Sequence, residues 1–242
     1  MSENYSQYDV IVIGAGVAGL YQLFKLRQLK LKALVIEAGD NVGGTWYWNR
    51  YPGARFDSES WSYGYSFSKE LFEEWDWPEH FAAQPDTLRY LNYVADKFDF
   101  RRDIKFDRRV EACVFDQQNN LWTVRTNTKE EYVARFLITA LGPLSAFTLP
   151  NIKGRETFKG PAYHTARWPH EEVDFSGKRV GVIGTGACAI QTIQTIAKDV
   201  AHLTVFQRSP NWAAPLNNSV ITEDEQKQIK QDFEKIFEQT FL

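Results

Sequence analysis

Residues 8–39 read YDVIVIGAGVAGLYQLFKLRQLKLKALVIEAG and decide the fold of the first part of the chain. An apolar run from Tyr8 to Ile13 predicts a buried strand that leads directly into a Gly-x-Gly-x-x-Gly loop beginning at Gly14. Apolar residues at helical spacing follow, and then a second apolar strand over 33–36 that ends at Glu37. Strand, glycine loop, helix and strand together predict a βαβ unit that binds the pyrophosphate of a dinucleotide.

A second unit of the same kind occupies residues 177–212, GKRVGVIGTGACAIQTIQTIAKDVAHLTVFQRSPNW. A strand predicted over 179–183 leads to Gly184 and Gly186, and Ala189 stands at the third position, where the requirement is close packing of the helix. Glu37 follows Gly14 by 23 positions, and the same count from Gly184 reaches Gln207, which Arg208 follows.

The difference between Glu37 and Arg208 predicts two different coenzymes. A carboxylate accepts hydrogen bonds from a ribose 2′-hydroxyl but repels a 2′-phosphate, whereas a guanidinium binds that phosphate through charge-assisted hydrogen bonds. The first unit therefore fits an unphosphorylated adenosine ribose, such as that of FAD, and the second fits NADPH. The alternative for Arg208 is a solvated surface arginine at the end of a strand.

Composition excludes several other classes of protein. A net charge of -3 and a pI of about 5.9 leave no broad positive surface for nucleic acid. The N-terminus has no basic leader and the longest apolar stretch, residues 10–20, is too short to cross a bilayer, so we expect a cytoplasmic protein without a membrane partner. Cys113 and Cys188 have neither redox-pair nor metal-ligand spacing, so we expect two reduced thiols and no metal.

The rest of the chain completes an α/β fold. Residues 108–128 alternate apolar and polar side chains on either side of a turn, and residues 131–142 supply a further strand. We expect two Rossmann-type dinucleotide-binding domains, FAD then NADP, with an antiparallel β-meander and an incomplete second domain. The predicted boundaries are residues 1–142 for the FAD-binding domain, 143–176 for an inter-domain linker, and 177–242 for the NADP-binding domain.

Residues 46–81 hold more than a third of the aromatic residues of the chain. Flat rings suit the wall of an aromatic cofactor or an apolar substrate. We prefer that interpretation to a plain core, because glycine and proline interrupt the run repeatedly.

The linker carries the most specific motif, FKGPAYHTARWPH at residues 158–170. Its pattern, Phe158-x-Gly160-x-x-x-His164-x-x-x-Trp168-Pro169, resembles the fingerprint of the type I Baeyer–Villiger monooxygenases. Residues 43–60, GGTWYWNRYPGARFDSES, and 138–145, ITALGPLS, also resemble segments of that family. The related N- and S-oxygenating flavin monooxygenases typically lack the final Trp-Pro.

The resemblance implies an enzyme that uses FAD, NADPH and O2 to convert ketones into esters or lactones. The residues it assigns to FAD are Gly14, Gly16, Gly19, Glu37, Gly44, Thr45, Trp46 and Asp57. Those it assigns to NADPH are Gly184, Gly186, Ala189 and Arg208. Asp57, His164 and Trp168 are the candidate catalytic residues. In the family, the acid at the position of Asp57 supports an arginine that stabilises the peroxyflavin. We expect that arginine beyond residue 242.

His164 lies in the linker, where we expect a hinge or a hydrogen-bonding role rather than proton transfer. Hydrogen bonding to the local backbone is the alternative for this side chain.

Members of the family are much longer than 242 residues, so we expect a truncated chain, inactive alone toward ketones. Residues 219–242 predict an amphipathic helix whose apolar stripe needs a partner, which indicates self-association or completion by a C-terminal fragment. Two alternatives stay open, namely an N- or S-oxygenating flavin monooxygenase and a non-catalytic FAD-binding remnant completed by another chain.

Overall fold

The computed structural model describes residues 7–240 and divides into two compact units. Unit 1 contains the chain up to Trp48 together with Leu91–Pro150, and unit 2 contains Asn49–Tyr90 together with the chain from Asn151 onward. The segment 49–90 thus packs with residues more than 60 positions further along, which the sequence patterns did not indicate.

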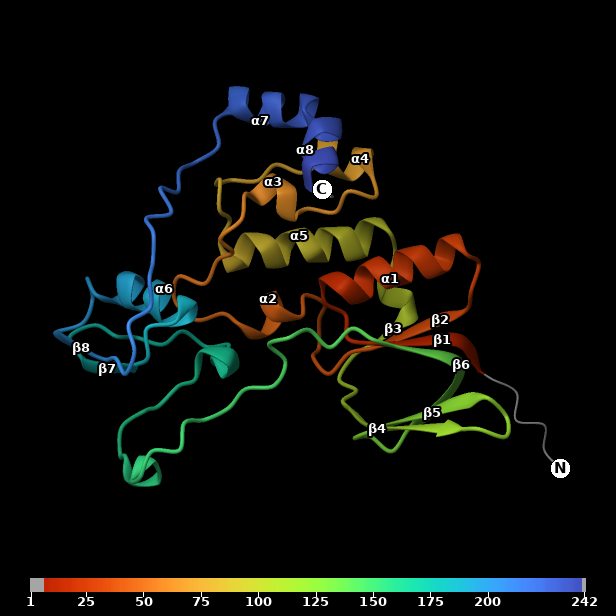
Figure 1. The fold of residues 1–242 in the computed structure, drawn as a ribbon, viewed down its shortest axis with the longest axis horizontal. Helices are drawn as coiled ribbons and strands as arrows, with labels where there is room; N and C mark the ends of the chain where they lie inside the picture. The colour runs from red at the N-terminus through yellow and green to blue at the C-terminus, as the bar shows by residue number, and fades with distance from the viewer. Residues whose placement is uncertain (1–6, 241–242) are drawn as a thin grey trace. The chain divides into compact units, whose positions relative to one another are not determined.

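Unit 1 is built on a six-stranded sheet with the order β3-β2-β1-β6-β5-β4 (Figure 1). Its strands are β1 (Tyr8–Ile13), β2 (Ala33–Ile36), β3 (Ile104–Lys105), β4 (Val110–Asp116), β5 (Leu121–Thr126) and β6 (Glu131–Thr139). The four strands β3, β2, β1 and β6 run parallel, while β4 and β5 are antiparallel neighbours attached to β6. The predicted α/β class, with a meander joined to a Rossmann-type sheet, is confirmed.

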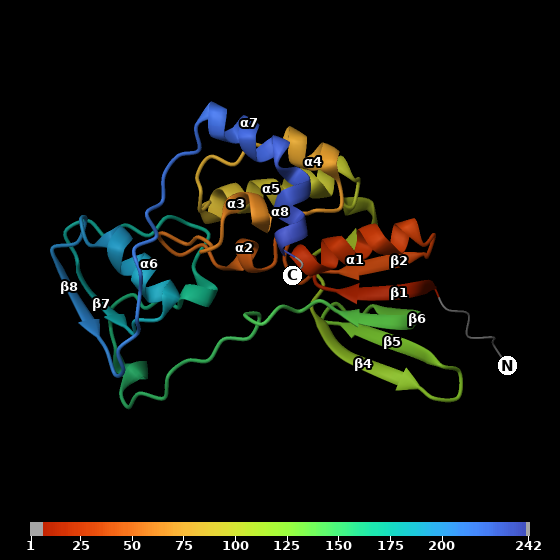
Figure 2. The same ribbon diagram turned by 45° about the horizontal axis from the view of Figure 1, so that its top comes forward.

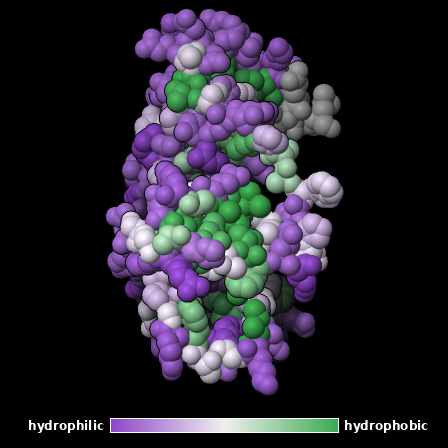
Figure 3. All heavy atoms as spheres, turned by 90° about the vertical axis from the view of Figure 1, so that its left-hand side faces the viewer, coloured by the Kyte–Doolittle hydropathy of each residue, from purple (hydrophilic) through white to green (hydrophobic). Residues whose placement is uncertain are grey.

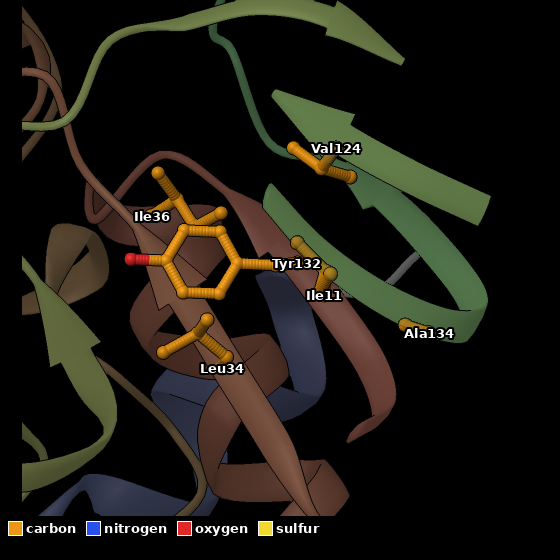
Figure 4. Packing of buried hydrophobic residues seen from close by; sticks show 6 residues of the cluster. All are labelled: Ile11, Leu34, Ile36, Val124, Tyr132 and Ala134. Atoms are coloured by element: carbon orange, nitrogen blue, oxygen red, sulfur yellow. The ribbon is translucent and has the colours of Figure 1, made fainter. Parts of the chain in front are cut away.

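Both faces of β1 are covered, which explains its continuous apolar sequence. Helix α1 (Val17–Gln28) lies over β1 and β2 and buries Leu20 and Leu23 (Figure 2). On the other face, a core cluster joins the parallel strands to β5 and β6, and its members are Ile11, Leu34, Ile36, Val124, Tyr132 and Ala134. Figure 4 shows the ring of Tyr132 between Leu34 and Ile36, where it closes this face.

Unit 2 contains the second glycine loop on a smaller sheet. Strands β7 (Arg179–Ile183) and β8 (His202–Phe206) pair in parallel, and α6 (Ala187–Ile196) connects them. Because this sheet has two strands within the described residues, Ile183 and Phe206 remain 64% and 57% exposed. Figure 3 shows hydrophobic atoms gathered on the face of the molecule that carries these elements. The prediction of an incomplete second Rossmann-type sheet agrees with this arrangement.

The rest of the described chain combines irregular segments with further helices, of which α5 is the longest. Their bounds are α2 (Thr45–Trp48), α3 (Ser60–Tyr63), α4 (Lys69–Glu74), α5 (Gln84–Lys97), α7 (Glu223–Gln231) and α8 (Phe233–Thr240), with 3-10 turns η1 (Arg101–Asp103), η2 (Arg155–Thr157) and η3 (Thr165–Arg167). No helix within residues 7–240 has both the length and the apolar character needed to cross a membrane. Cys113 and Cys188 are free thiols, as predicted, and burial raises the pKa of Cys113.

The C-terminal region differs from its prediction in two respects. Two helices form instead of one, because the first ends at Asp232, and a capping box of Thr222 and Glu225 begins α7. The apolar stripe was also expected to lack a partner within the chain, and this was wrong. Phe233 and Phe237 pack on Phe72 of α4, with ring centroids 5.0 and 5.6 Å away, and are 9% and 8% exposed.

Candidate functional site

The first glycine loop needs glycine at two positions because the backbone packs closely there. Gly14 has a φ of +103°, and a Cβ at this position would lie 2.6 Å from the carbonyl oxygen of Ala140, just beyond β6. A Cβ at Gly19 would lie 1.9 Å from the carbonyl oxygen of Gly14, so the start of α1 sits directly on the loop. Any larger residue would displace the loop from the helix or from the sheet.

Gly16 brings the first loop against the predicted Gly44–Trp46 segment. A Cβ on Gly16 would lie 3.2 Å from the Cα of Gly44, and a Cβ on Gly44 would lie 2.8 Å from the Cα of Gly16. Gly44 has a φ of +54°, and Thr45 begins α2 immediately after it, with Trp46 6% exposed. The residues of unit 1 that were predicted to bind FAD therefore lie in one region of the structure, around the first glycine loop.

Glu37 holds the shape of this loop with both of its carboxylate oxygens. Oε2 accepts a hydrogen bond from the N–H of Ala15 at 2.7 Å, and Oε1 accepts one from the N–H of Gly39 at 2.8 Å. The side chain is 5% exposed. A carboxylate has about four acceptor positions, so two are left for a ligand such as a ribose hydroxyl.

The second loop repeats the backbone geometry of the first. Gly184 has a φ of +102°, and its N–H donates to the carbonyl of Phe206 at 2.9 Å, as the N–H of Gly14 donates to that of Ile36 at 2.9 Å. Gly16 and Gly186 are both extended N-cap residues, and among the described residues no side chain caps α1 or α6. This register makes Glu37 and Gln207 structurally equivalent, as the residue count predicted.

Gln207 and Arg208 give the second loop different chemistry. Gln207 Nε2 donates to Thr185 Oγ1 at 2.9 Å, so a neutral amide occupies the place where Glu37 binds the first loop. Arg208 follows with an exposed side chain, and Ala189 is half-buried on α6. No described atom lies within 4 Å of where a Cβ on Gly184 or Gly186 would stand, so the space beside this loop is open.

Sequence reasoning missed the residues that attach the segment 51–55 to α6. The hydroxyl of Tyr51 donates to Gln191 Oε1 at 2.8 Å, and Gln191 Nε2 donates to the carbonyl of Arg55 at 3.0 Å. Burial and the neighbouring Cys188 thiol raise the pKa of Tyr51 well above its usual range. Gln191 is one of several polar residues in helix 187–196, so the sequence did not single it out.

Most of the aromatic run is core, which corrects the preferred interpretation of that segment. Rings from Phe56 to Tyr90 pack on one another, including Trp77 on Phe56 at 6.0 Å and on Tyr90 at 4.9 Å. They surround a cavity of about 10 Å³, which is too small for any organic ligand. Asp57 lies within this run, next to the buried Phe56, and is itself exposed.

The two linker candidates lie close together in sequence and have local partners. His164 begins the 3-10 turn η3, and its Nδ1 accepts the N–H of Ala166 at 3.1 Å, the local contact that was weighed as the alternative. Trp168 stacks at a tilt between Tyr163 and Phe175, with ring centroids 5.4 and 6.1 Å away. Their assignment to catalysis remains a prediction.

Comparison with known proteins places this fold and these loops in a family. Residues 11–240 match the family model described as pyridine nucleotide-disulphide oxidoreductase. An acetone monooxygenase (methyl acetate-forming) from Gordonia sp. (strain TY-5) is 49% identical over 93% of this chain and 42% of its own length. A phenazine N-monooxygenase from Lysobacter antibioticus is 44% identical over 98% of this chain and 44% of its own length.

A solved structure of OTEMO in complex with FAD and NADP superimposes with a TM-score of 0.93 at 48% identity, covering 97% of this chain and 45% of that one. The chain thus spans less than half the length of the relatives it matches. It belongs to the pyridine nucleotide-disulphide oxidoreductase family, and its resemblance to the Baeyer–Villiger monooxygenases is confirmed by relatives that carry that name or form an ester from a ketone.

Proposed function

We propose that this chain binds FAD at the first glycine loop and NADPH at the second. The whole protein would be a Baeyer–Villiger monooxygenase that inserts one oxygen atom of O2 next to a ketone carbonyl. The observation that carries the proposal is that two loops of the same backbone geometry differ in the residue that follows the second strand, Glu37 in one and Gln207-Arg208 in the other. Relatives that form methyl acetate from acetone, or that were solved with FAD and NADP, support it.

The residues present fit both coenzymes. The first loop offers an uncapped helix start and a carboxylate with acceptor positions to spare, which suits a diphosphate and a ribose. The second offers an uncapped helix start beside open space and an exposed guanidinium, which suits a diphosphate and a 2′-phosphate. FAD would supply the redox and oxygen chemistry when bound.

The protein's own contribution is binding, orientation and exclusion of water. Glu37 keeps the first loop in shape, and Gly44 packs against that loop at Gly16. We assign Thr45 and Trp46, which follow Gly44, to FAD as well. We assign Arg208 to the 2′-phosphate, with Gly184, Gly186 and Ala189 in the loop that holds the diphosphate. Asp57 is the residue we assign nearest to the chemistry, with His164 and Trp168 in the linker. By function we propose an FAD domain over residues 1–142, a linker over 143–176 and an NADP domain over 177–242, a division that differs from the one into two compact units.

A second candidate function is oxygenation of nitrogen. The phenazine N-monooxygenase is nearly as similar as the acetone monooxygenase, so overall identity does not separate the two substrate classes. The Trp168-Pro169 ending of the fingerprint favours a ketone as the substrate, because the related N- and S-oxygenating flavin monooxygenases typically lack it. Product analysis of the whole protein with acetone, cyclohexanone and phenazine separates the candidates, because ester or lactone formation supports the first and N-oxide formation supports the second.

Coenzyme assignment is tested in the 242-residue chain with two matched variants, Gly16→Val and Gly186→Val. The first pushes a branched side chain against Gly44 and should abolish flavin retention after desalting. The second meets no described atom within 4 Å, so it should leave the fold intact and weaken only NADP⁺ binding. Retention of flavin by Gly16→Val, or loss of flavin rather than NADP⁺ in Gly186→Val, would overturn the assignment.

A further inference from the structure

Gln191 makes three hydrogen bonds to one short segment of unit 2. Its Oε1 accepts the Tyr51 hydroxyl at 2.8 Å and the N–H of Arg55 at 3.4 Å, while its Nε2 donates to the carbonyl of Arg55 at 3.0 Å. The amide therefore pairs with a backbone N–H and C=O in the manner of a neighbouring strand. Only a side chain that both donates and accepts can make this set of contacts.

The backbone of the same segment lies directly on α6. Gly53 has a φ of +79°, and a Cβ there would lie 2.2 Å from Thr195 Oγ1 and 2.7 Å from the carbonyl oxygen of Gln191. Glycine is therefore required for both conformation and space. Residues 51–55 rest on the helix without an intervening side chain at this point.

Arg55 holds the segment from its other side. Its guanidinium pairs with Glu79 at 3.0 Å and donates to the carbonyl of Phe81 at 3.1 Å. Asn218 Nδ2 donates to the same Glu79 carboxylate at 2.7 Å. Residues 51–55 are thus fixed between α6 and residues 79–81, and Asp57 follows two residues later.

We propose that Gln191 is a positioning residue that holds the Asp57 segment at a fixed place relative to the second glycine loop. Gln191 stands five residues after Gly186, one turn into the helix that the loop begins, so ordering of the loop by a coenzyme also orders residues 51–57. This coupling rests on the proposed NADPH site. The attachment of the segment to α6 rests on the contacts above alone.

The test is hydrogen exchange in the 242-residue chain, with and without NADP⁺. Gln191→Met keeps the length of the side chain but loses all three hydrogen bonds, and should lower the protection of amides in residues 51–57 by about tenfold without NADP⁺. The matched control is Gln194→Met, the same change at an exposed position of the same helix, which should leave protection unchanged.

Hydrogen exchange in the presence of NADP⁺ measures the coupling between the second glycine loop and residues 51–57. In the wild-type chain, NADP⁺ should raise protection in residues 51–57, and in Gln191→Met it should not, although NADP⁺ still binds within about threefold of wild-type affinity. A role in overall folding alone would change melting temperature and affinity together and would leave the NADP⁺-induced rise in place. Tyr51→Phe removes one of the three hydrogen bonds from the side of the segment and adds no charge, so it should give intermediate protection and serves if Gln191→Met fails to fold.

Wild-type protection in Gln191→Met, or an NADP⁺-induced rise of wild-type size in that variant, would overturn the positioning role. Failure of the wild-type chain to bind NADP⁺ would refute the coenzyme assignment and with it the coupling. In that case the comparison without coenzyme still decides whether Gln191 holds the segment.

Discussion

Glu37→Gln should destabilise unit 1 even in the absence of any coenzyme. The carboxylate accepts two backbone N–H groups, from Ala15 at 2.7 Å and from Gly39 at 2.8 Å, in a site where it is 5% exposed. An amide can serve only one of them and turns its own N–H2 toward the other. The loss of one charge-assisted hydrogen bond, with a donor left facing a donor, should cost about 2–4 kcal/mol.

Urea unfolding measures this loss directly. With a slope of about 3 kcal/mol per molar urea, the midpoint of the unit 1 transition should fall by about 1 M. Glu111→Gln is the control, because Glu111 is exposed on β4 and pairs with Lys129 at 3.5 Å, a surface contact worth at most about 1 kcal/mol. If Glu37→Gln shifts the midpoint no more than Glu111→Gln does, the carboxylate does not hold the loop as argued.

Two further predictions concern coenzyme choice and alkaline pH. Arg208→Ala should weaken NADPH binding about ten- to hundredfold and leave NADH binding nearly unchanged in fluorescence titrations, whereas equal losses would show that the guanidinium does not contact a 2′-phosphate. Burial raises the pKa of Tyr51, Tyr65 and Tyr90 above the usual value of 10.0, so the stability they contribute is complete below about pH 10 and is lost as the pH rises further. Their phenolate absorbance should therefore appear only together with unfolding in circular dichroism, and titration of all tyrosines near pH 10 in a folded chain would contradict this.

Local patterns predicted the parts of the fold that depend on local sequence. The strands of both βαβ units and the hairpin of β4 and β5 follow from apolar runs and glycine spacing, and the structure confirms them. The equivalence of Glu37 and Gln207 was also predictable, because both loops keep one register between the first glycine and the second strand.

Contacts between distant segments were not predictable in the same way. The close approach of Gly16 to Gly44 is one example, because neither the first loop nor the segment after Val42 carries a pattern that pairs them. The partner of Phe233 is Phe72, which stands in a run of rings that fitted a cofactor wall as well as a core. Nothing in the spacing of residues within either segment specifies which other segment will cover it.

The packing of segment 49–90 with the chain beyond Asn151 has a consequence for protein engineering. A fragment that began at residue 151, or a chimera that exchanged only the residues from 151 onward, would separate Phe233 and Phe237 from Phe72 and Trp61 and separate Gln191 from Tyr51. The unit that can be transplanted is therefore discontinuous, and a donor protein would have to contribute its counterpart of residues 49–90 as well. Shuffled libraries with a single crossover between residues 91 and 150 would join each α6 to a foreign partner segment, and many of their members should fail to fold for that reason.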